Sequence, residues 1–315
     1  MINLPKLVDL DVSNKKVLLR LDLDTEPNQN DLRIKTSEET LNYLKGKNSQ
    51  IIILAHRGRP GGDRDLSLKP FQPIFDKWGA RVEENLRFDP GEEANDPEFS
   101  RRLAGLGDVY VNEAFGNSHR DHASIVGLPK LLPHAAGFHF IVEVENLGKV
   151  FGSKALFIIG GVKEDKLEYL EGLKKIADKI LVGGRLPDYA EVQGDSKILF
   201  ANLLPDKEDL TINSIEKFEK EIAKAGTIVL SGPMGKYEDE GHRLGTERIF
   251  KAVAASSAFK VAGGGNTESA ISLLGLRGQF DWISVGGGAM LEFLAKRTLP
   301  GIKALESANL NMEGW

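Results

Sequence analysis

The feature that most constrains the fold of this chain is a regular alternation along the sequence. Short runs of β-branched and aliphatic residues alternate with stretches that repeat apolar residues at helical spacing. This alternation is typical of a parallel β-sheet, because each parallel strand needs a crossover, usually a helix, before the next one. In the first half we expect strands at Lys16–Leu21, Gln50–Ala55, Arg81–Glu83, Asp108–Asn112 and, shorter, near Gly137–Val142. In the second half we expect them at Ala155–Ile159, Lys179–Val182, Thr227–Leu230, Ala258–Ala262 and Asp281–Val285.

The stretches between these strands carry helix signals. A capping box at Thr36–Glu39 predicts a helix start, with Leu41 and Leu44 on the buried face. A second helix is predicted through Leu167, Leu170 and Leu173, and a third carries Ile215, Phe218 and Ile222 and ends at Gly226. Helices on both faces of parallel sheets indicate an α/β protein, and 315 residues suit about two domains.

Composition excludes several classes of function. The formal net charge of −5 argues against a nucleic-acid partner. The absence of cysteine from the sequence excludes disulfides, thiolate metal sites and cysteine nucleophiles. The N-terminus has no apolar signal region, and runs such as Ile51–Leu54 are too short to span a bilayer. We therefore expect a soluble cytoplasmic protein without a membrane partner.

The residues that follow each strand differ between the two halves. Ligands of doubly wound sheets bind at the carboxyl ends of the strands, so these residues indicate what is bound. Every predicted strand of the second half is followed by glycine, at Gly160–Gly161, Gly183–Gly184, Gly232–Gly235, Gly263–Gly265 and Gly286–Gly288. Those of the first half are followed by polar groups, at Asp22, Asp24, His56–Arg59, Arg87, Asn112–Glu113 and Arg120. The two halves are therefore expected to bind different ligands.

The glycines of the second half are typical of phosphate binding. Gly263–Gly265 opens a predicted helix, with Asn266 and Thr267 as residues of N-cap type, and such a helix start attracts anions. Alternatively, each Gly-Gly pair only forms a tight turn, which is the favoured interpretation for one pair but not for five. Lys163 and Lys166 lie three residues apart at the start of a predicted helix, and hence on one face. They either clamp phosphates or are solvated helix lysines paired with Glu164 or Asp165.

The polar strand ends of the first half predict an anion site. Five basic groups fall at or just beyond strand ends, and arginine suits bidentate recognition of carboxylate and phosphate: Arg33, His56, Arg59, Arg87 and Arg120. The alternative is that these arginines only pair with neighbouring acids such as Asp89, Glu92 or Asp121. His119 and His122 have no further ligands at the spacing of a zinc site.

Taken together, these motifs resemble phosphoglycerate kinases over nearly the whole chain. RLDLD resembles the family's RVDFN, AHRGRP its SHLGRP, EENLRF its LENLRF, and DVYVNEAFGNSHRDHAS its DVYVNDAFGTAHRAHAS. In the second half, GGVKEDK resembles GGAKVSDK, SGPMGKYE resembles NGPMGVFE, and GGGNT stands where GGGDT is usual. ISVGGGAMLEFLAKRTLPGIKAL is similar to a signature near the family's C-terminus.

The resemblance implies two Rossmann-like, doubly wound parallel-sheet lobes joined by a hinge that closes for catalysis. Residues 1–145 would bind the acid sugar, residues 146–298 the nucleotide, and residues 299–315 would return to the first lobe. The implied glycolytic reaction is reversible phosphoryl transfer between ATP and 3-phosphoglycerate, giving 1,3-bisphosphoglycerate and ADP, with Mg²⁺ carried by the nucleotide. A monomer is expected.

The resemblance also assigns residues. Arg33 and Lys163 would be catalytic. The acid sugar would be held by Asp22, Asp24, Arg33, His56, Arg57, Gly58, Arg59, Arg87 and Arg120. The nucleotide would be held by Gly161, Val162, Lys166, Gly184, Glu238 (at the ribose), Gly264, Gly265, Asn266 and Thr267.

Several positions depart from the family pattern. Asn266 replaces the aspartate that holds the nucleotide's Mg²⁺, and Asp24 replaces an asparagine. The lysine loop is one residue shorter, Arg185 stands at a third glycine of the adenine pocket, and the region Asp188–Thr211 is abbreviated. Two alternatives therefore stay open: a catalytically weakened homologue that binds a ligand or partner, or a kinase for another small carboxylate.

Overall fold

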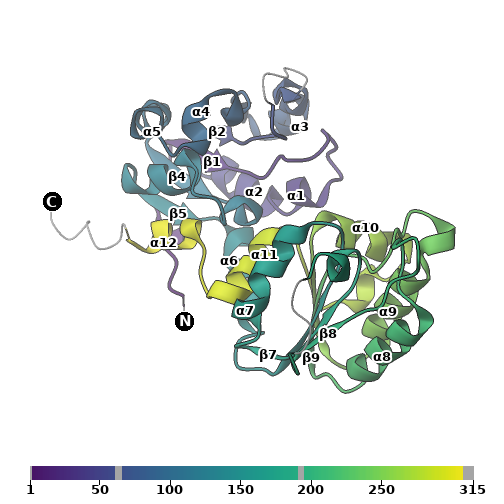
Figure 1. Cartoon of the computed structure of the whole chain (residues 1–315). Helices are drawn as coiled ribbons and strands as arrows, with labels where there is room; N and C mark the ends of the chain where they lie inside the picture. The colour runs from purple at the N-terminus through teal and green to yellow at the C-terminus, as the bar shows by residue number, and fades with distance from the viewer. Residues whose placement is uncertain (1, 61–65, 191–194, 308–315) are drawn as a thin grey trace. The chain divides into compact units, whose positions relative to one another are not determined.

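A computed structural model describes residues 2–60, 66–190 and 195–307 of the chain (Figure 1). Its internal contacts separate the chain into two compact units. The first comprises Met1–Val144 and Thr298–Trp315, and the second comprises Glu145–Arg297. The ligand-binding roles of the predicted lobes, 1–145 and 146–298, stay a prediction, and residues 308–315 of the predicted returning segment lie outside the described residues.

The first unit contains a five-stranded parallel sheet of order β3-β2-β1-β4-β5. Its strands are β1 (Lys16–Arg20), β2 (Gln50–Leu54), β3 (Arg81–Val82), β4 (Val109–Asn112) and β5 (His134–Ala136). Its helices are α1 (Leu32–Lys35), α2 (Glu38–Gly46), α3 (Gln72–Phe75), α4 (Pro90–Glu93), α5 (Pro97–Ala104) and α12 (Pro300–Ser307). The parallel sheet expected from the sequence is confirmed, with its middle strand β1 buried from Val17 onward.

The prediction of a strand near Gly137–Val142 is wrong. β5 lies just before it, and α6 (Phe138–Gly148) begins where the strand was expected. The aromatic and β-branched residues of this stretch suit a strand, but a buried carboxylate satisfies the first free N–H groups of a helix here. Glu113 accepts hydrogen bonds from the backbone N–H groups of His139 (3.2 Å) and Phe140 (3.0 Å).

The predicted capping box at Thr36–Glu39 does not form. Thr36 ends α1 with a helical backbone, and its hydroxyl donates to the carbonyl oxygen of Arg33 at 3.3 Å instead of capping α2. The N-cap of α2 is Ser37, whose side chain makes no capping hydrogen bond. The carboxylate of Asp31 caps α1 instead, by accepting from the N–H of Arg33 at 2.8 Å. Leu41 and Leu44 are buried, as the periodicity predicts.

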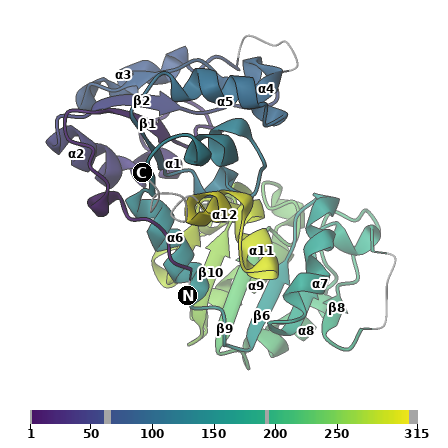
Figure 2. The same cartoon turned by 90° about the vertical axis from the view of Figure 1, so that its left-hand side faces the viewer.

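The second unit contains a six-stranded parallel sheet of order β11-β10-β9-β6-β7-β8, and Figure 2 shows the arrows of β6, β9 and β10 within it. Its strands are β6 (Ala155–Ile159), β7 (Ala177–Val182), β8 (Ile198–Phe200), β9 (Thr227–Ser231), β10 (Phe259–Gly263) and β11 (Trp282–Ser284). Its helices are α7 (Leu170–Leu173), α8 (Ile212–Ile222), α9 (Leu244–Ala255), α10 (Gly265–Leu273) and α11 (Gly287–Lys296). The edge strand β8 was not predicted.

Two predicted helices of this unit differ in detail. The stretch through Leu167 is a 3₁₀ helix (Glu164–Tyr169) that leads into the short α7. The apolar face of α8 is as predicted, because Ile215, Phe218 and Ile222 are all buried, but the helix ends at Ile222 rather than beside Gly226. No helix in the described part of the chain is both long and apolar enough to cross a membrane.

The segment after α11 packs on the first unit. The N–H of Gly301 donates to the carbonyl oxygen of Ser118 at 2.9 Å, and the ring of His134 lies 3.1 Å from the carbonyl oxygen of Leu305. Ala304 joins Ile125 and Val126 in a small apolar cluster. The described residues of α12 therefore complete the first unit.

Candidate functional site

Acidic and basic side chains meet at the carboxyl end of β1. Asp22 and Asp24 follow this strand, and Arg33 reaches both from α1. The Arg33 Nε atom lies 3.4 Å from the Asp22 carboxylate, and its Nη1 donates to the Asp24 carbonyl oxygen at 2.7 Å. The Asp24 carboxylate accepts from the N–H of Gly58 at 2.7 Å, so the loops after β1 and β2 are tied together.

The next arginines along the edge join the same cluster. Arg87 donates from Nη1 to the carbonyl oxygen of Gly58 at 2.6 Å and pairs with Glu93 at 2.9 Å. Arg57 pairs with Glu26 at 2.6 Å, and the side chain of Arg59 is exposed. Pairing with neighbouring acids thus does occur here.

The three acids named for that pairing have other partners. Asp89 binds Arg102, Asp121 accepts from Asn95 at 3.3 Å, and Glu92 lies in the buried network of Arg20 described below. The arginines that were predicted to bind the ligand are thus not neutralised by these three acids.

Several N–H donors of this cluster point to an anion. Three nitrogen atoms of this cluster are among the buried nitrogen atoms that have no hydrogen-bond acceptor in the described part of the chain: His56 Nε2, Arg87 Nη2 and Arg120 Nε. A buried donor left without a partner costs about 1–3 kcal/mol, and a phosphate or carboxylate would satisfy all three. Burial, followed by the charges of the surrounding arginines, holds the pKa of His56 well below its ordinary value of 6.5.

One member of this region was missed by the sequence analysis. Arg20, the last residue of β1, is fully buried and lies 2.7 Å from the ring of His56. The available signal is a cation directly after the apolar run Val17–Leu19 of a buried strand, where a buried charge requires partners.

In the second unit, the glycine-rich strand ends are packed against one another. The N–H of Gly161 donates to the carbonyl oxygen of Pro233 at 2.8 Å, and the N–H of Arg185 donates to the carbonyl oxygen of Gly161 at 2.9 Å. Gly184 has a φ of +60°, and a Cβ atom added there would lie 2.3 Å from the nitrogen of Gly161. Part of the glycine pattern therefore reflects close contact between loops, as the turn alternative held.

The two lysines do not share one helical face as predicted. Lys163 precedes the 3₁₀ helix in extended conformation and is exposed. The Lys166 ammonium turns inward and donates to the carbonyl oxygens of Gly160 (2.8 Å) and Ser231 (3.1 Å). Burial lowers the pKa of Lys166 to about 8. Lys166 therefore braces the glycine loops.

The predicted N-cap residues of α10 lie within its first turn, because Gly264 is the N-cap and the helix begins at Gly265. Thr267 Oγ1 donates to the Gly263 carbonyl oxygen at 2.8 Å and accepts from the N–H of Gly232 at 2.8 Å. A methyl group at Gly265 would meet no atom within 4 Å. The backbone at this helix start is therefore open to a ligand.

The other residues assigned to the nucleotide lie at the surface. Val162, Glu238 and Asn266 are exposed.

Residues 2–60, 66–190 and 195–307 contain no group of three or more histidine, aspartate or glutamate side chains arranged to hold a metal ion. Asn266 offers a neutral amide oxygen, whereas Mg²⁺ is usually held by one or two carboxylates together with phosphates.

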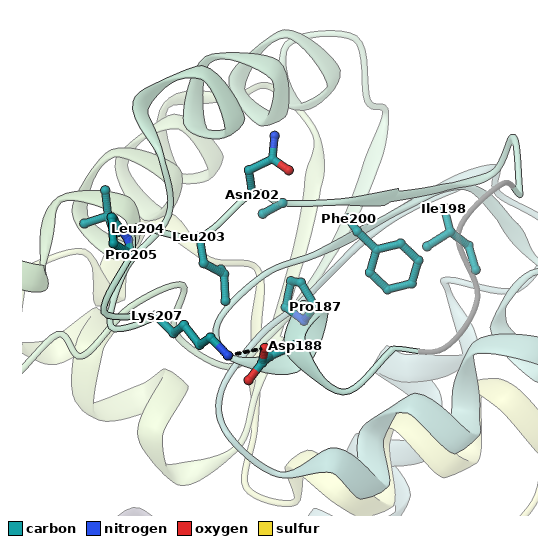
Figure 3. A pocket seen from close by; sticks show the side chains of 10 residues that line it. Pro187, Asp188, Ile198, Phe200, Asn202, Leu203, Leu204, Pro205 and Lys207 are labelled. Carbon is teal, nitrogen blue, oxygen red and sulfur yellow. Dashed lines mark hydrogen bonds and ion pairs between the residues drawn. The ribbon is translucent and has the colours of Figure 1, made fainter.

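A pocket of about 570 Å³ lies beside the ends of β7 and β8 (Figure 3). Phe200, Leu203 and Pro187 give it apolar walls, and the Lys207–Asp188 ion pair at 2.7 Å lies at one side. Most of its lining residues belong to the abbreviated region Asp188–Thr211, which begins a few residues after Gly183 and Gly184.

Comparison with known proteins identifies the family. The phosphoglycerate kinase family model matches residues 7–83, 80–198 and 196–297. The phosphoglycerate kinase of Dictyoglomus turgidum is 34% identical over 387 aligned residues, which cover 95% of this chain and 97% of that protein. That of Moorella thermoacetica is 32% identical, with coverage of 95% and 98%.

Solved structures agree. The phosphoglycerate kinase of Coxiella burnetii superposes with a TM-score of 0.78 at 27% identity, covering 97% of this chain and 99% of that one. That of Pyrococcus horikoshii gives a TM-score of 0.80 at 26% identity, with the same coverage. The Dictyoglomus alignment of 387 residues is longer than this chain of 315, so that relative carries stretches with no counterpart here.

Proposed function

The chain belongs to the phosphoglycerate kinase family, and from this premise we propose that it transfers a phosphoryl group reversibly between ATP and 3-phosphoglycerate. The products are 1,3-bisphosphoglycerate and ADP. The structural observation that carries the proposal is the set of buried donors without acceptors in the first unit, at His56, Arg87 and Arg120. A small acid that bears both a phosphate and a carboxylate has the charge to satisfy them.

We propose that the first unit binds the acid. Arg33 is held by Asp22 and by the Asp24 carbonyl oxygen, so its position is set before the ligand arrives. Arg59, exposed beyond β2, would add a mobile charge, and Arg57 and Gly58 would shape the same loop. The nucleophile is a carboxylate, which is ionised at neutral pH, so the reaction requires no general base.

We propose that the second unit binds the nucleotide. The open backbone at Gly264 and Gly265 supports a phosphate position at the start of α10, where the free N–H groups and the helix dipole favour negative charge. Exposed Lys163 is free to follow the transferred group, whereas Lys166 would act by holding the glycine loops. Phosphoryl transfer depends mainly on alignment and positive charge around the moving group, which Arg33 would supply to the acid and Lys163 to the nucleotide.

Asn266 is a weaker ligand for Mg²⁺ than the aspartate that the family pattern has at this position. Asn266 supplies a neutral oxygen, and the carboxylate of the nearby Glu268 pairs with Arg277. We propose that any Mg²⁺ arrives with the nucleotide and is held mainly by phosphates and water. A cytoplasmic location and a monomeric state remain predictions.

A coupled assay with ATP, Mg²⁺ and 3-phosphoglycerate tests the function. We expect turnover in well-folded protein, and a drop of at least about tenfold in kcat/KM for Arg33→Met, because a buried charge-assisted contact is worth about 1.5–3 kcal/mol. Exposed Arg81 pairs with Glu83 and lies at the start of β3, so Arg81→Met is a matched control. Absence of turnover in protein that still binds ATP would favour a ligand-binding homologue.

Turnover with another small carboxylate, in a substrate panel run beside 3-phosphoglycerate, would instead favour a kinase of different specificity. We expect 3-phosphoglycerate to be preferred, because its phosphate adds negative charge and acceptor oxygens for the basic groups of the first unit.

A further inference from the structure

Arg20 is held on several sides by buried partners. Its Nε atom donates to Ser124 Oγ at 2.8 Å, Nη1 donates to the carbonyl oxygen of Leu21, and Nη2 lies 2.7 Å from His56 Nδ1. The Ser124 hydroxyl donates to Glu92 Oε1 at 2.6 Å, and this carboxylate lies 3.9 Å from the guanidinium. Arg20 is thus a buried cation whose countercharge and geometry are supplied by the fold.

This arrangement decides which nitrogen of His56 carries the proton. A guanidinium only donates hydrogen bonds, so His56 Nδ1 must accept the bond from Arg20. A neutral imidazole that accepts at Nδ1 carries its proton on Nε2. His56 Nε2 is buried and has no acceptor among the described residues. Its N–H is therefore available to a ligand.

A second proton on His56 is disfavoured by the surroundings. It would place an N–H at Nδ1 against the N–H groups of Arg20. The other charged or titratable neighbours are Arg87, Arg120 and His122, and each also opposes a positive charge on the ring. The acid of the network, Glu92, is occupied by the hydroxyl and the N–H of Ser124.

We propose that Arg20 is a positioning residue that fixes His56 as the neutral tautomer with its proton on Nε2, so that His56 offers the bound anion one uncharged N–H donor. The identity of that anion rests on the proposed function, whereas the tautomer is a property of the ligand-free chain. His56 would then bind a phosphate or carboxylate oxygen through a directed hydrogen bond from an uncharged ring. Its contribution to the affinity for the anion would not vary with pH near neutrality.

Nuclear magnetic resonance of the full chain labelled with ¹⁵N-histidine tests the tautomer directly. We expect His56 to show an unprotonated Nδ1 and a protonated Nε2, unchanged between about pH 6 and 8, where an ordinary histidine titrates. The signals lost in His56→Gln assign the ring. A proton on Nδ1, or a titration within that range, would overturn the proposal. This experiment needs no substrate, so it is decisive even if the chain shows no kinase turnover.

Arg20→Lys tests the positioning role. Lysine keeps a positive charge near Glu92 but lacks the planar fork that contacts Ser124 and His56 together. Because burial and the charges of Arg87 and Arg120 remain, we expect His56 to stay uncharged in this variant but to lose its fixed tautomer, so that Nδ1 and Nε2 are each partly protonated. We also expect the KM for 3-phosphoglycerate to rise about twofold or more, because only part of the His56 population then offers an Nε2–H to the anion. The KM for ATP should not change.

Tyr110→Phe is the matched control. It removes a buried hydroxyl that donates to the Ser124 carbonyl oxygen at 2.7 Å, on the same network but without a bond to His56. We expect lower stability, with the His56 tautomer and the KM for 3-phosphoglycerate unchanged. An unchanged His56 tautomer in folded Arg20→Lys would contradict the positioning role. If Arg20→Lys does not fold, the parent spectrum still decides the tautomer.

Discussion

The substitution Gly265→Ala tests whether Gly265 is required for ligand binding or for the stability of the fold. Gly265 is the first residue of α10, and an added methyl group would meet no atom within 4 Å. Because alanine is favoured over glycine in a helix by about 0.5–1 kcal/mol, we expect the variant to be as stable as the parent or more stable by up to that amount. A phosphate bound against this backbone would meet the methyl group. We therefore expect the affinity for ATP to fall about tenfold, which is about 1.4 kcal/mol.

Gly184→Ala is the matched comparison from the same unit. Its left-handed backbone, with φ of +60°, costs an alanine about 1–2 kcal/mol. Its Cβ atom would also lie 2.3 Å from the nitrogen and 2.5 Å from the oxygen of Gly161, and such overpacking typically costs about 1–3 kcal/mol. We expect the free energy of unfolding to fall by about 2–5 kcal/mol, with nucleotide binding weakened because the glycine loops shift.

Urea denaturation and calorimetric titration with ATP measure the two quantities separately. We expect the free energy of unfolding and the affinity for ATP to move in opposite directions or independently in Gly265→Ala, and to fall together in Gly184→Ala. Unchanged ATP affinity in Gly265→Ala would refute a phosphate position at this helix start. A loss of stability in that variant would refute the open space assigned to Gly265.

Three further changes have defined outcomes. Asn266→Asp should bind ATP more tightly in the presence of Mg²⁺ and not in its absence, because a carboxylate is the preferred ligand; calorimetry with and without the metal checks this. Glu113→Gln should lower the free energy of unfolding by about 1–3 kcal/mol, since its amide would turn a donor toward an N–H of α6; urea denaturation measures it. The carboxylates of Asp239 and Asp206 raise the pKa of His242 above 6.5, so their stabilising effect is complete below that value and is lost as pH rises through the raised pKa. The thermal midpoint of the parent should fall relative to His242→Gln across this window, and parallel pH profiles would contradict it.

The parallel sheets could be predicted because their strands have a strong local signal. Ala155–Ile159 is apolar throughout and matches β6 residue for residue. The edge strand β8 could not be predicted in the same way. Ile198, Leu199 and Phe200 form only a three-residue strand, and each residue is half-buried. The stretch begins where two segments of the family match overlap, at residues 196–198. A short edge strand depends on its partner, here β7, more than on its own sequence.

Helix starts were less predictable than helices, because their backbone donors find partners from distant parts of the chain. Thr36–Glu39 has the sequence of a capping box, yet Thr36 is the C-cap of the preceding helix and has a helical backbone. At α6 the capping group comes from Glu113, far away in sequence. No local pattern near Phe138 contains that information.

The nucleotide side shows why residue type alone does not assign a role. Lys163 and Lys166 are the same residue three positions apart, and helical spacing would place them side by side. Lys163 lies before the helix, so this spacing does not apply to it. Lys166 finds two backbone carbonyl oxygens that the closely packed glycine loops leave exposed to its ammonium. An ammonium buried among carbonyl oxygens is costly to withdraw, since each hydrogen bond that it donates is charge-assisted. The loops that bring glycine close to a phosphate thus also bring their carbonyl oxygens close to one another, and this crowding creates the position that Lys166 fills.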